Sequence, residues 1–210
     1  KLNVNDAINK YIPNYPNGDS ITIHHLLTHT SGIKDFTKMK SIMSIAKKDM
    51  SPKELVDFFK DEPVDFQPGD KFNYNNSGYV VLGYIIELVS GISYEAFIEE
   101  HIFKKLDMNN SGYASDKEII QNRAYGYHNR GKLTNKMHVS LSIPYASGSL
   151  MSTIDDMLKW QEAIKTKKIL SQHSLQSIFS KNTLNSGESF AYGYGWHLKT
   201  ISGVDTHEHG

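Results

Sequence analysis

The sequence of 210 residues contains no cysteine, so it can form neither a disulfide framework nor a site that depends on a thiolate. It also lacks an excess of one charge, because 23 Lys and Arg residues balance 23 Asp and Glu residues. A neutral chain creates no long-range field that would attract nucleic acid or an anionic membrane surface. We therefore expect a small-molecule or peptide partner and no nucleic acid, and the oligomeric state stays open.

Long apolar runs are missing as well. The longest run, from Tyr79 to Val89, is roughly half the length that crosses a bilayer, and it contains Glu87. No transmembrane segment is therefore predicted. The opening residues, KLNVNDAINKYIP, do not follow the charged, apolar and small-residue order of a signal peptide, and both ends of the sequence are abrupt.

Helix start signals are frequent in the sequence. Ser51-Pro52-Lys53-Glu54 is a capping box with proline at the first helical position, and it predicts a helix over 52–60. Apolar residues at intervals of three and four from Asn76 to Val89, followed by Ser90-Gly91, predict a helix that is buried on most sides. Other caps and alternations predict helices over 94–105, 153–164 and 171–179, a short helix opening at 115–118, and a strand over 192–200.

The pattern Ser-x-x-Lys can supply a nucleophilic serine and a lysine that handles its proton, and it occurs at Ser31/Lys34 and at Ser44/Lys47. Chance alone produces roughly two such pairs in a chain with this content of Ser and Lys. Gly32 predicts the end of the preceding helix, so Lys34 would lie beyond that helix. The second pair lies in a polar, Lys-rich stretch that is typical of a solvated helix face. We therefore expect neither serine to be the nucleophile.

A tyrosine and an asparagine two residues apart, Tyr74 and Asn76, end a loop that leads into the predicted buried helix. Both side chains can point into one cleft, where a phenol transfers a proton and an amide binds a substrate carbonyl. The alternative is a packed tyrosine beside asparagine turns. Spacing alone does not decide between these interpretations.

The sequence ends in THEHG, which places His207 and His209 beside Glu208, and His25 and His29 lie four residues apart on a predicted helix. Such sets of histidines invite a zinc site. A zinc hydrolase of the His-Glu-x-x-His type needs a glutamate directly after its first histidine, and Leu26 occupies that position. We therefore expect no metal and no other cofactor.

Five blocks follow one another along the chain: ITIHHLLTHTSGI, FQPGDKFNYNNSGYVVLGYIIELVSG, IFKKLDMNNSGY, YASGSLMSTIDDMLKW and YGYGWHL. Together they closely resemble the serine beta-lactamase-like family, which includes class C beta-lactamases, D-alanyl-D-alanine carboxypeptidases and related esterases. The resemblance implies an α+β fold of the beta-lactamase/transpeptidase type, with a helical region packed on a mostly antiparallel sheet that is only partly present in this chain. We expect a mainly helical region over 1–140 and a region of helices and strands over 141–210.

The resemblance also implies roles for individual residues. Tyr74 would transfer a proton, Asn76 would contact the amide of the substrate, and His209 would bind the substrate carboxylate or assist Tyr74. Gly210 continues the family's His-x-Gly element, and Ser149 is expected beside the cleft as a substrate-binding residue, with a plain turn over 147–149 as the alternative. The implied chemistry is transfer of an acyl group to a serine, followed by hydrolysis of the ester, without a metal.

In the family, the catalytic Ser-x-x-Lys precedes a segment like KLNVNDAINKYIP. We therefore expect the nucleophile, its lysine and part of the oxyanion hole to lie outside these residues. The chain would then be a fragment of a longer serine hydrolase, and the alternative is a non-catalytic relative that binds a ligand or the cell wall. Histidine at position 209 favours a carboxypeptidase or esterase over a dedicated beta-lactamase. The resemblance alone implies an extracytoplasmic location.

Overall fold

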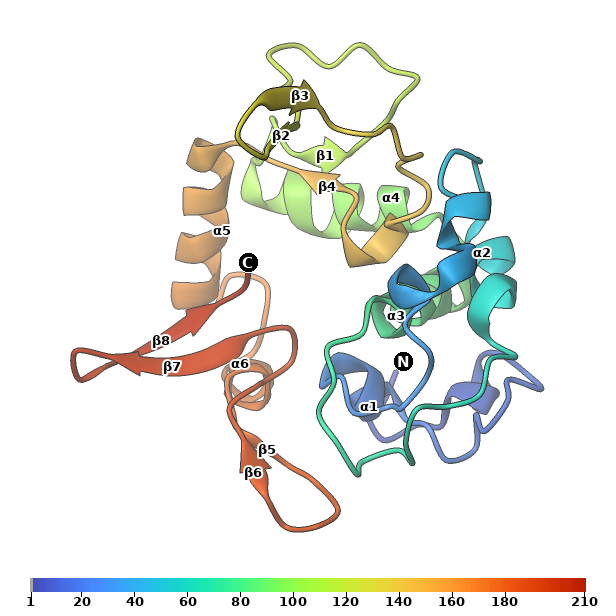
Figure 1. Cartoon of the computed structure of the whole chain (residues 1–210). Coiled ribbons are helices and arrows are strands. Elements are labelled where there is room, and N and C mark those ends of the chain that lie inside the picture. Colours follow the sequence, from blue (N-terminus) through green and yellow to red (C-terminus); the bar gives the residue numbers. More distant parts are fainter. Residues whose placement is uncertain (1) are drawn as a thin grey trace.

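The protein is described by a computed structural model over residues 2–210, and its fold is α+β, as predicted (Figure 1). The α-helices are α1 (Ile23–Leu27), α2 (Pro52–Phe59), α3 (Asn76–Ser90), α4 (Tyr94–Ile98), α5 (Ile154–Lys165) and α6 (Gln172–Ile178). Figure 1 shows α1 to α3 on one side of the molecule, with α5, α6 and the last two strands on the other. Short 3-10 helices include Phe36–Lys38 and Tyr145–Ser147.

The strands of the described residues form four separate antiparallel pairs. The pairs are β1 (Gly112–Tyr113) with β4 (Leu150–Met151), β2 (Tyr127–Asn129) with β3 (Leu133–Asn135), β5 (Asn182–Thr183) with β6 (Ser189–Phe190), and β7 (His197–Ile201) with β8 (Val204–Glu208). The antiparallel pairing was predicted, but these residues do not build one continuous sheet. The predicted strand over 192–200 is shifted, because the chain turns at Gly195, with φ of 81°, before β7 begins.

Helix α3 is the centre of the core. Its N-cap Asn75 accepts a hydrogen bond from the Gly78 amide, and Gly91 ends the helix in the left-handed conformation with φ of 76°. Val80, Val81 and Ile85 are almost fully buried where α3 packs against α1, α2, α4 and the Tyr145–Ser147 turn. The prediction of a helix buried on most sides is wrong only for its last turn, which exposes Leu88 and Val89.

Local capping signals place most helix starts correctly. Ser51 and Glu54 form the predicted reciprocal capping box of α2, in which the Ser51 hydroxyl accepts from the Glu54 amide and the Glu54 carboxylate accepts from the Ser51 amide. Ser93, Thr153 and Ser171 likewise cap α4, α5 and α6. The predicted helix over 94–105 is helical throughout, but it changes after α4 into a π-turn at Glu99–Phe103 and a 3-10 turn at Lys104–Leu106.

The short helix predicted to open at 115–118 is absent from the structure. The Ser115 hydroxyl does accept hydrogen bonds from the amides of Lys117 and Glu118, as an N-cap would. However, Ile119 is 98% exposed, so a helix here would have no apolar face to bury. A cap without packing does not overcome the cost of helix nucleation, and residues 116–118 form only a bend.

Among the described residues, no helix alone has the length and apolar character to span a membrane. Helix α3 and the helical segment Tyr94–Leu106 meet that test only when taken together, and they are bent by 80° relative to one another.

Gly83 allows α3 to approach the Tyr145–Ser147 turn. A Cβ at this position would lie 2.3 Å from Cβ of Ala146 and 2.8 Å from Cε1 of Tyr145. We predict that Gly83→Ala lowers the free energy of unfolding by about 1–3 kcal/mol through overpacking, although alanine is the better helix former. Urea unfolding measures this change. Gly112→Ala is the matched control because a Cβ at Gly112 meets nothing within 4 Å, and equal losses from both substitutions would contradict the packing argument.

Candidate active site

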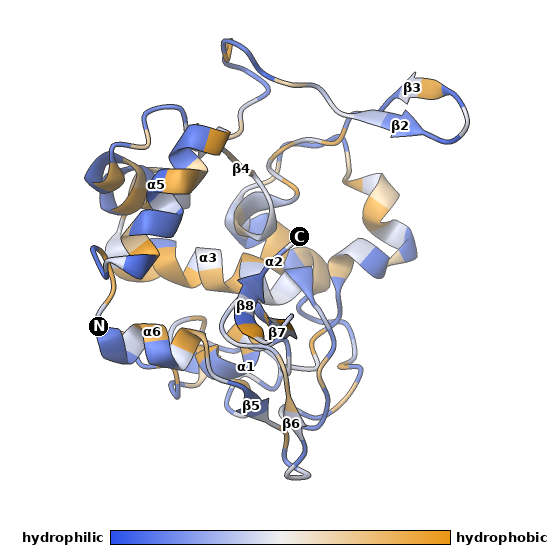
Figure 2. Cartoon of the chain, turned by 90° about the vertical axis from the view of Figure 1, so that its left-hand side faces the viewer, coloured by the Kyte–Doolittle hydropathy of each residue, from blue (hydrophilic) through white to orange (hydrophobic). Residues whose placement is uncertain are grey.

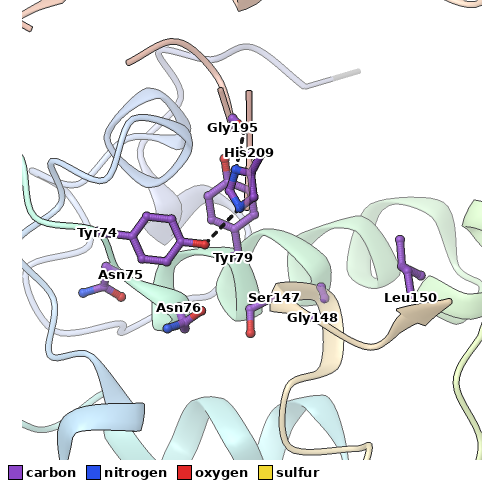
Figure 3. Close-up of a pocket in the computed structure, with 10 residues that line it drawn as sticks. Tyr74, Asn75, Asn76, Tyr79, Ser147, Gly148, Leu150, Gly195 and His209 are labelled. Atoms are coloured by element: carbon purple, nitrogen blue, oxygen red, sulfur yellow. Dashed lines mark hydrogen bonds between the residues drawn. The ribbon is translucent and has the colours of Figure 1, made fainter. Parts of the chain in front are cut away.

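A pocket of about 250 Å³ opens at the N-terminus of α3, where the two sides of the molecule meet (Figure 3). Segments that are far apart in the sequence line it, namely the loop into α3 with the first turn of that helix, the turn before β4 with the first residue of β4, the turn before β7 and the residue after β8. The lining residues are Tyr74, Asn75, Asn76, Tyr79, Ala146, Ser147, Gly148, Leu150, Gly195 and His209. The structure thus brings together Tyr74, Asn76 and His209, which the sequence had singled out.

Tyr74 and His209 are hydrogen-bonded across the pocket. The Tyr74 hydroxyl lies 3.2 Å from Nε2 of His209, and Nδ1 of His209 lies 2.7 Å from the carbonyl oxygen of Gly195 (Figure 3). A carbonyl oxygen can only accept a hydrogen bond, so Nδ1 carries a proton. In the neutral imidazole, Nε2 is then the acceptor, and the Tyr74 hydroxyl donates to it.

The β7–β8 hairpin sets the position of His209. Ser202 and Gly203 both have positive φ, at 52° and 79°, and form the two-residue turn between Ile201 and Val204. Such a turn fixes the strand register, and it pairs His197 with Glu208, so that His209 follows directly beside Gly195. A slip of one residue would turn every side chain of β8 to the opposite face.

A buried carboxylate orients Asn76 through Thr37. The Asn76 side-chain amide donates to Oγ1 of Thr37 at 3.3 Å, and that hydroxyl donates to Oδ1 of Asp35 at 2.8 Å. Asp35 is only 2% exposed. Because the NH₂ group of Asn76 faces Thr37, the carboxamide oxygen on the other side remains free to accept a hydrogen bond from a ligand.

His29 lies directly beneath Tyr74 and was not predicted as a site residue. It is 2% exposed, lies beyond the end of α1 with φ of 58°, and its ring centroid is 4.2 Å from that of Tyr74. The expectation that it shares a helix with His25 is therefore wrong. Its Nδ1 accepts from the Asn75 amide at 3.1 Å, and its Nε2 lies 2.9 Å from the Tyr192 hydroxyl.

Burial determines the protonation of these aromatic groups. It lowers the pKa of His29 to about 3, so this imidazole is neutral and donates from Nε2 to Tyr192. Burial also raises the pKa of the Tyr74 phenol, and the nearby Asp35 carboxylate raises it further. Tyr74 is therefore a neutral phenol and a hydrogen-bond donor at neutral pH.

Ser31, Ser44 and Ser149, the serines considered in the sequence analysis, do not line the pocket. Ser149 is 1% exposed, its hydroxyl donates to the Leu141 carbonyl at 2.5 Å, and it does not line the pocket. Ser147 lines the pocket instead, with its hydroxyl donating to the Pro144 carbonyl at 2.6 Å. Ser31 is buried, and Ser44 ends an exposed 3-10 helix.

The lysines of both Ser-x-x-Lys patterns and Gly210 also lie outside the pocket lining. Lys34 forms an ion pair with Asp65, with 2.6 Å between Nζ and Oδ1. Gly210 follows His209 at the end of the chain. The structure therefore gives neither serine of these patterns access to the Tyr74–His209 pair.

The other histidines at the two ends of the chain, His24, His25 and His207, have hydrogen-bond or stacking partners of their own. Nδ1 of His24 is hydrogen-bonded to the Tyr194 hydroxyl, His25 accepts from the Thr22 amide in the capping box of α1, and His207 stacks on Phe179 with 4.1 Å between ring centroids. Over the described residues, no group of three His, Asp or Glu side chains comes together as a metal site would require.

Solved structures share this architecture. A D-stereospecific amidohydrolase from Streptomyces sp. superposes with a TM-score of 0.85 at 23% identity, over 100% of this chain and 67% of that one, which shows the fold. A penicillin-binding protein from Bacillus halodurans gives a TM-score of 0.81 at 27% identity over 97% and 63% of the two chains. A D-amino acid amidase from Ochrobactrum anthropi SV3 gives 0.83 at 26% identity over 99% and 61%. The fold is that of beta-lactamases and penicillin-binding proteins.

Sequence relationships identify the family. The Beta-lactamase family model matches residues 1–210, and the chain belongs to this family. PbpX of Bacillus subtilis, named as a penicillin-binding protein, is 34% identical over 94% of this chain and 48% of its own length. The human mitochondrial serine beta-lactamase-like protein LACTB is 35% identical over 53% of this chain and 20% of its own length. The chain spans about half the length of the first of these relatives.

The neutral state of His29 makes the stability of the protein depend on pH. Its folded pKa of about 3 lies below the ordinary value of 6.5, so the unfolded chain binds more protons between these values. Stability from this group is fully present above pH 6.5 and is lost as the pH falls toward 3. We predict that the free energy of unfolding decreases by up to about 1.4 kcal/mol for each unit by which the pH falls below 6.5, because the unfolded chain binds one more proton, on His29, than the folded chain.

The His29→Asn variant tests this dependence, because the asparagine oxygen can replace Nδ1 as the acceptor and asparagine tolerates positive φ. Burial also lowers the pKa of His24 and of His25, so the relevant quantity is the difference in slope between the two proteins in urea unfolding from pH 7 to pH 4. A variant with the same slope as the parent protein would contradict the assignment of a buried, neutral His29.

Proposed function

We propose that these residues form part of the active site of a serine hydrolase that works through an acyl-enzyme. The observation that supports this most directly is the pocket in which Tyr74 and Asn76, at the start of α3, meet His209, which follows β8. The substrates we propose are a peptide of the D-Ala-D-Ala type, a small ester or amide, or a beta-lactam. Because position 209 is a histidine, we rank the peptidase and esterase activities above a dedicated beta-lactamase activity.

In this proposal, proton transfer runs along the Tyr74–His209 hydrogen bond. His209 accepts the phenol proton at Nε2 while Gly195 holds the opposite proton on Nδ1. The phenolate oxygen of Tyr74 then takes the proton of the attacking serine hydroxyl, whose oxygen forms the bond to the substrate carbonyl carbon. When the bond to the leaving group breaks, Tyr74 returns this proton to it, and His209 gives the first proton back.

The serine that attacks lies, in our proposal, outside residues 1–210, on a Ser-x-x-Lys segment of a longer chain. This fits the geometry described above, in which the Tyr74–His209 pair lies open to a pocket whose serine, Ser147, is bonded to a backbone carbonyl. A lysine ammonium beside Tyr74 would also oppose the effect of burial and lower the pKa of the phenol. Asn76 would hold the amide of the substrate. Binding of the substrate carboxylate is the alternative role of His209, in place of its assistance to Tyr74.

We further propose that the protein acts outside the cytoplasm, on the cell wall or on small esters and amides. Support comes from the penicillin-binding proteins among its relatives and structural neighbours. The amidohydrolase and the amidase named above add D-configured amides to the substrate classes to be tested.

Covalent labelling of the natural full-length protein tests this function. We predict that a fluorescent penicillin or fluorophosphonate labels one serine outside residues 1–210, mapped by peptide mass spectrometry. Tyr74→Phe should slow this acylation by roughly 10²- to 10⁴-fold, because it removes the hydroxyl that transfers the proton. Tyr84→Phe, a half-buried tyrosine of α3 outside the pocket, is the control and should label normally.

Two results would contradict the proposal. A label on Ser31 or Ser44 would mean that the nucleophile lies within this chain and that the pocket is not the active site. A folded full-length protein that binds penicillin reversibly, without forming an adduct, would instead support a non-catalytic ligand-binding relative.

A further inference from the structure

Residues 119–138, here called the basic arm, have a composition unlike that of the rest of the chain. They contain Arg123, Arg130, Lys132 and Lys136 and no aspartate or glutamate, although the chain as a whole is neutral. Such a local excess of positive charge attracts anionic partners even when the net charge of the protein is zero.

The basic arm is built around the β2–β3 hairpin. Its strands are joined by the three-residue loop Arg130–Lys132 at the tip. At the other end of the hairpin, a hydrogen bond from the Lys136 amide to the Gly126 carbonyl, at 3.4 Å, continues the pairing of the two strands. Figure 2 shows this hairpin standing away from the body of the molecule. A two-stranded hairpin with no neighbour is only marginally stable in water, so a partner surface would stabilise it.

One face of the hairpin is apolar and exposed. Tyr127 pairs with Asn135 and Leu133 pairs with Asn129, so these side chains share a face, and alternation adds Tyr125 and Met137 to it. Tyr127 is 61% exposed and Leu133 is 68% exposed, and Tyr125 and Met137 are also exposed. The figure coloured by hydropathy shows the apolar part of β3 at the outer edge of the molecule (Figure 2).

The cations lie at the tip and on the opposite face. The Lys136 side chain lies over Gly126 on that second face, and Arg130 and Lys132 flank the tip. Within residues 2–210, none of these three forms an ion pair, whereas Arg123 pairs with Asp116 at 3.6 Å. The hairpin therefore combines unpaired cations with exposed tyrosine, leucine and methionine side chains.

We propose that the basic arm docks on a lipid bilayer whose surface carries anionic headgroups. Tyrosine and leucine side chains of the apolar face enter the headgroup region, and the arginine and lysine side chains pair with phosphates. The boundary of a bilayer offers apolar and anionic contacts within a few ångströms of each other, as this amphipathic hairpin requires. A soluble polyanion would leave the apolar face in water. The proposal does not depend on the proposed hydrolase activity.

Vesicle binding by the natural full-length protein tests this proposal. The protein should sediment with vesicles of equal parts phosphatidylglycerol and phosphatidylcholine, and only weakly with pure phosphatidylcholine. We predict that Arg130→Gln/Lys132→Gln weakens binding to the anionic vesicles roughly thirtyfold. Tyr127→Ser/Leu133→Ser should weaken it about tenfold or more by removing the apolar contact. Lys167→Gln/Lys168→Gln changes two exposed lysines outside the arm and is the matched control.

Because the substituted side chains are exposed, circular dichroism of the variants should match that of the parent protein. Three outcomes would overturn the proposal. The first is absent binding, or equal binding to neutral and anionic vesicles. The second is binding that depends on the cations but not on Tyr127 and Leu133, which would indicate a soluble polyanion. The third is a dimer, detected by sedimentation velocity, that Tyr127→Ser/Leu133→Ser dissociates while lipid is not bound.

Discussion

The pocket depends on one buried, neutral imidazole. His29 has a hydrogen-bond partner on each ring nitrogen, the Asn75 amide on Nδ1 and the Tyr192 hydroxyl on Nε2, and its ring lies against that of Tyr74. It therefore joins the loop after α1, the start of α3 and the segment before β7. Burying an ionisable group costs free energy unless it is neutral and paired, and both conditions hold here. Through these contacts His29 supports Tyr74 and Tyr79, which line the pocket.

The helices that depend on interactions between neighbouring residues could be predicted from the sequence. The capping boxes and apolar spacing of α2 and α3 depend on residues within a few positions of one another, so their positions were confirmed. The helix at 115–118 was wrong because a serine cap cannot replace burial, and Ile119 finds nothing to pack against. The division of the chain at residue 140 remains a prediction.

The site residues show the same limit of sequence-based reasoning. The pairing of Tyr74 with His209, 135 positions apart, followed from the resemblance and not from local pattern. His29 was considered only as a zinc ligand on a predicted helix with His25, because no local pattern shows that the fold brings Tyr74 and Tyr192 to it. Ser149 was expected beside the cleft, but the turn buries it and directs Ser147 into the pocket. Net charge likewise concealed the local charge of the basic arm.

The most direct test of the proposed site is to determine the tautomers of His29 and His209, which the structure predicts to be opposite. ¹⁵N nuclear magnetic resonance of the histidine-labelled protein, recorded from pH 5 to pH 8, distinguishes protonated from unprotonated ring nitrogens. The structure predicts a proton on Nε2 of His29 throughout this range, without titration, and a proton on Nδ1 of neutral His209 with Nε2 as the acceptor. A His29 that titrates near its ordinary pKa, or a His209 protonated on Nε2 alone, would contradict the Tyr74–His209 arrangement.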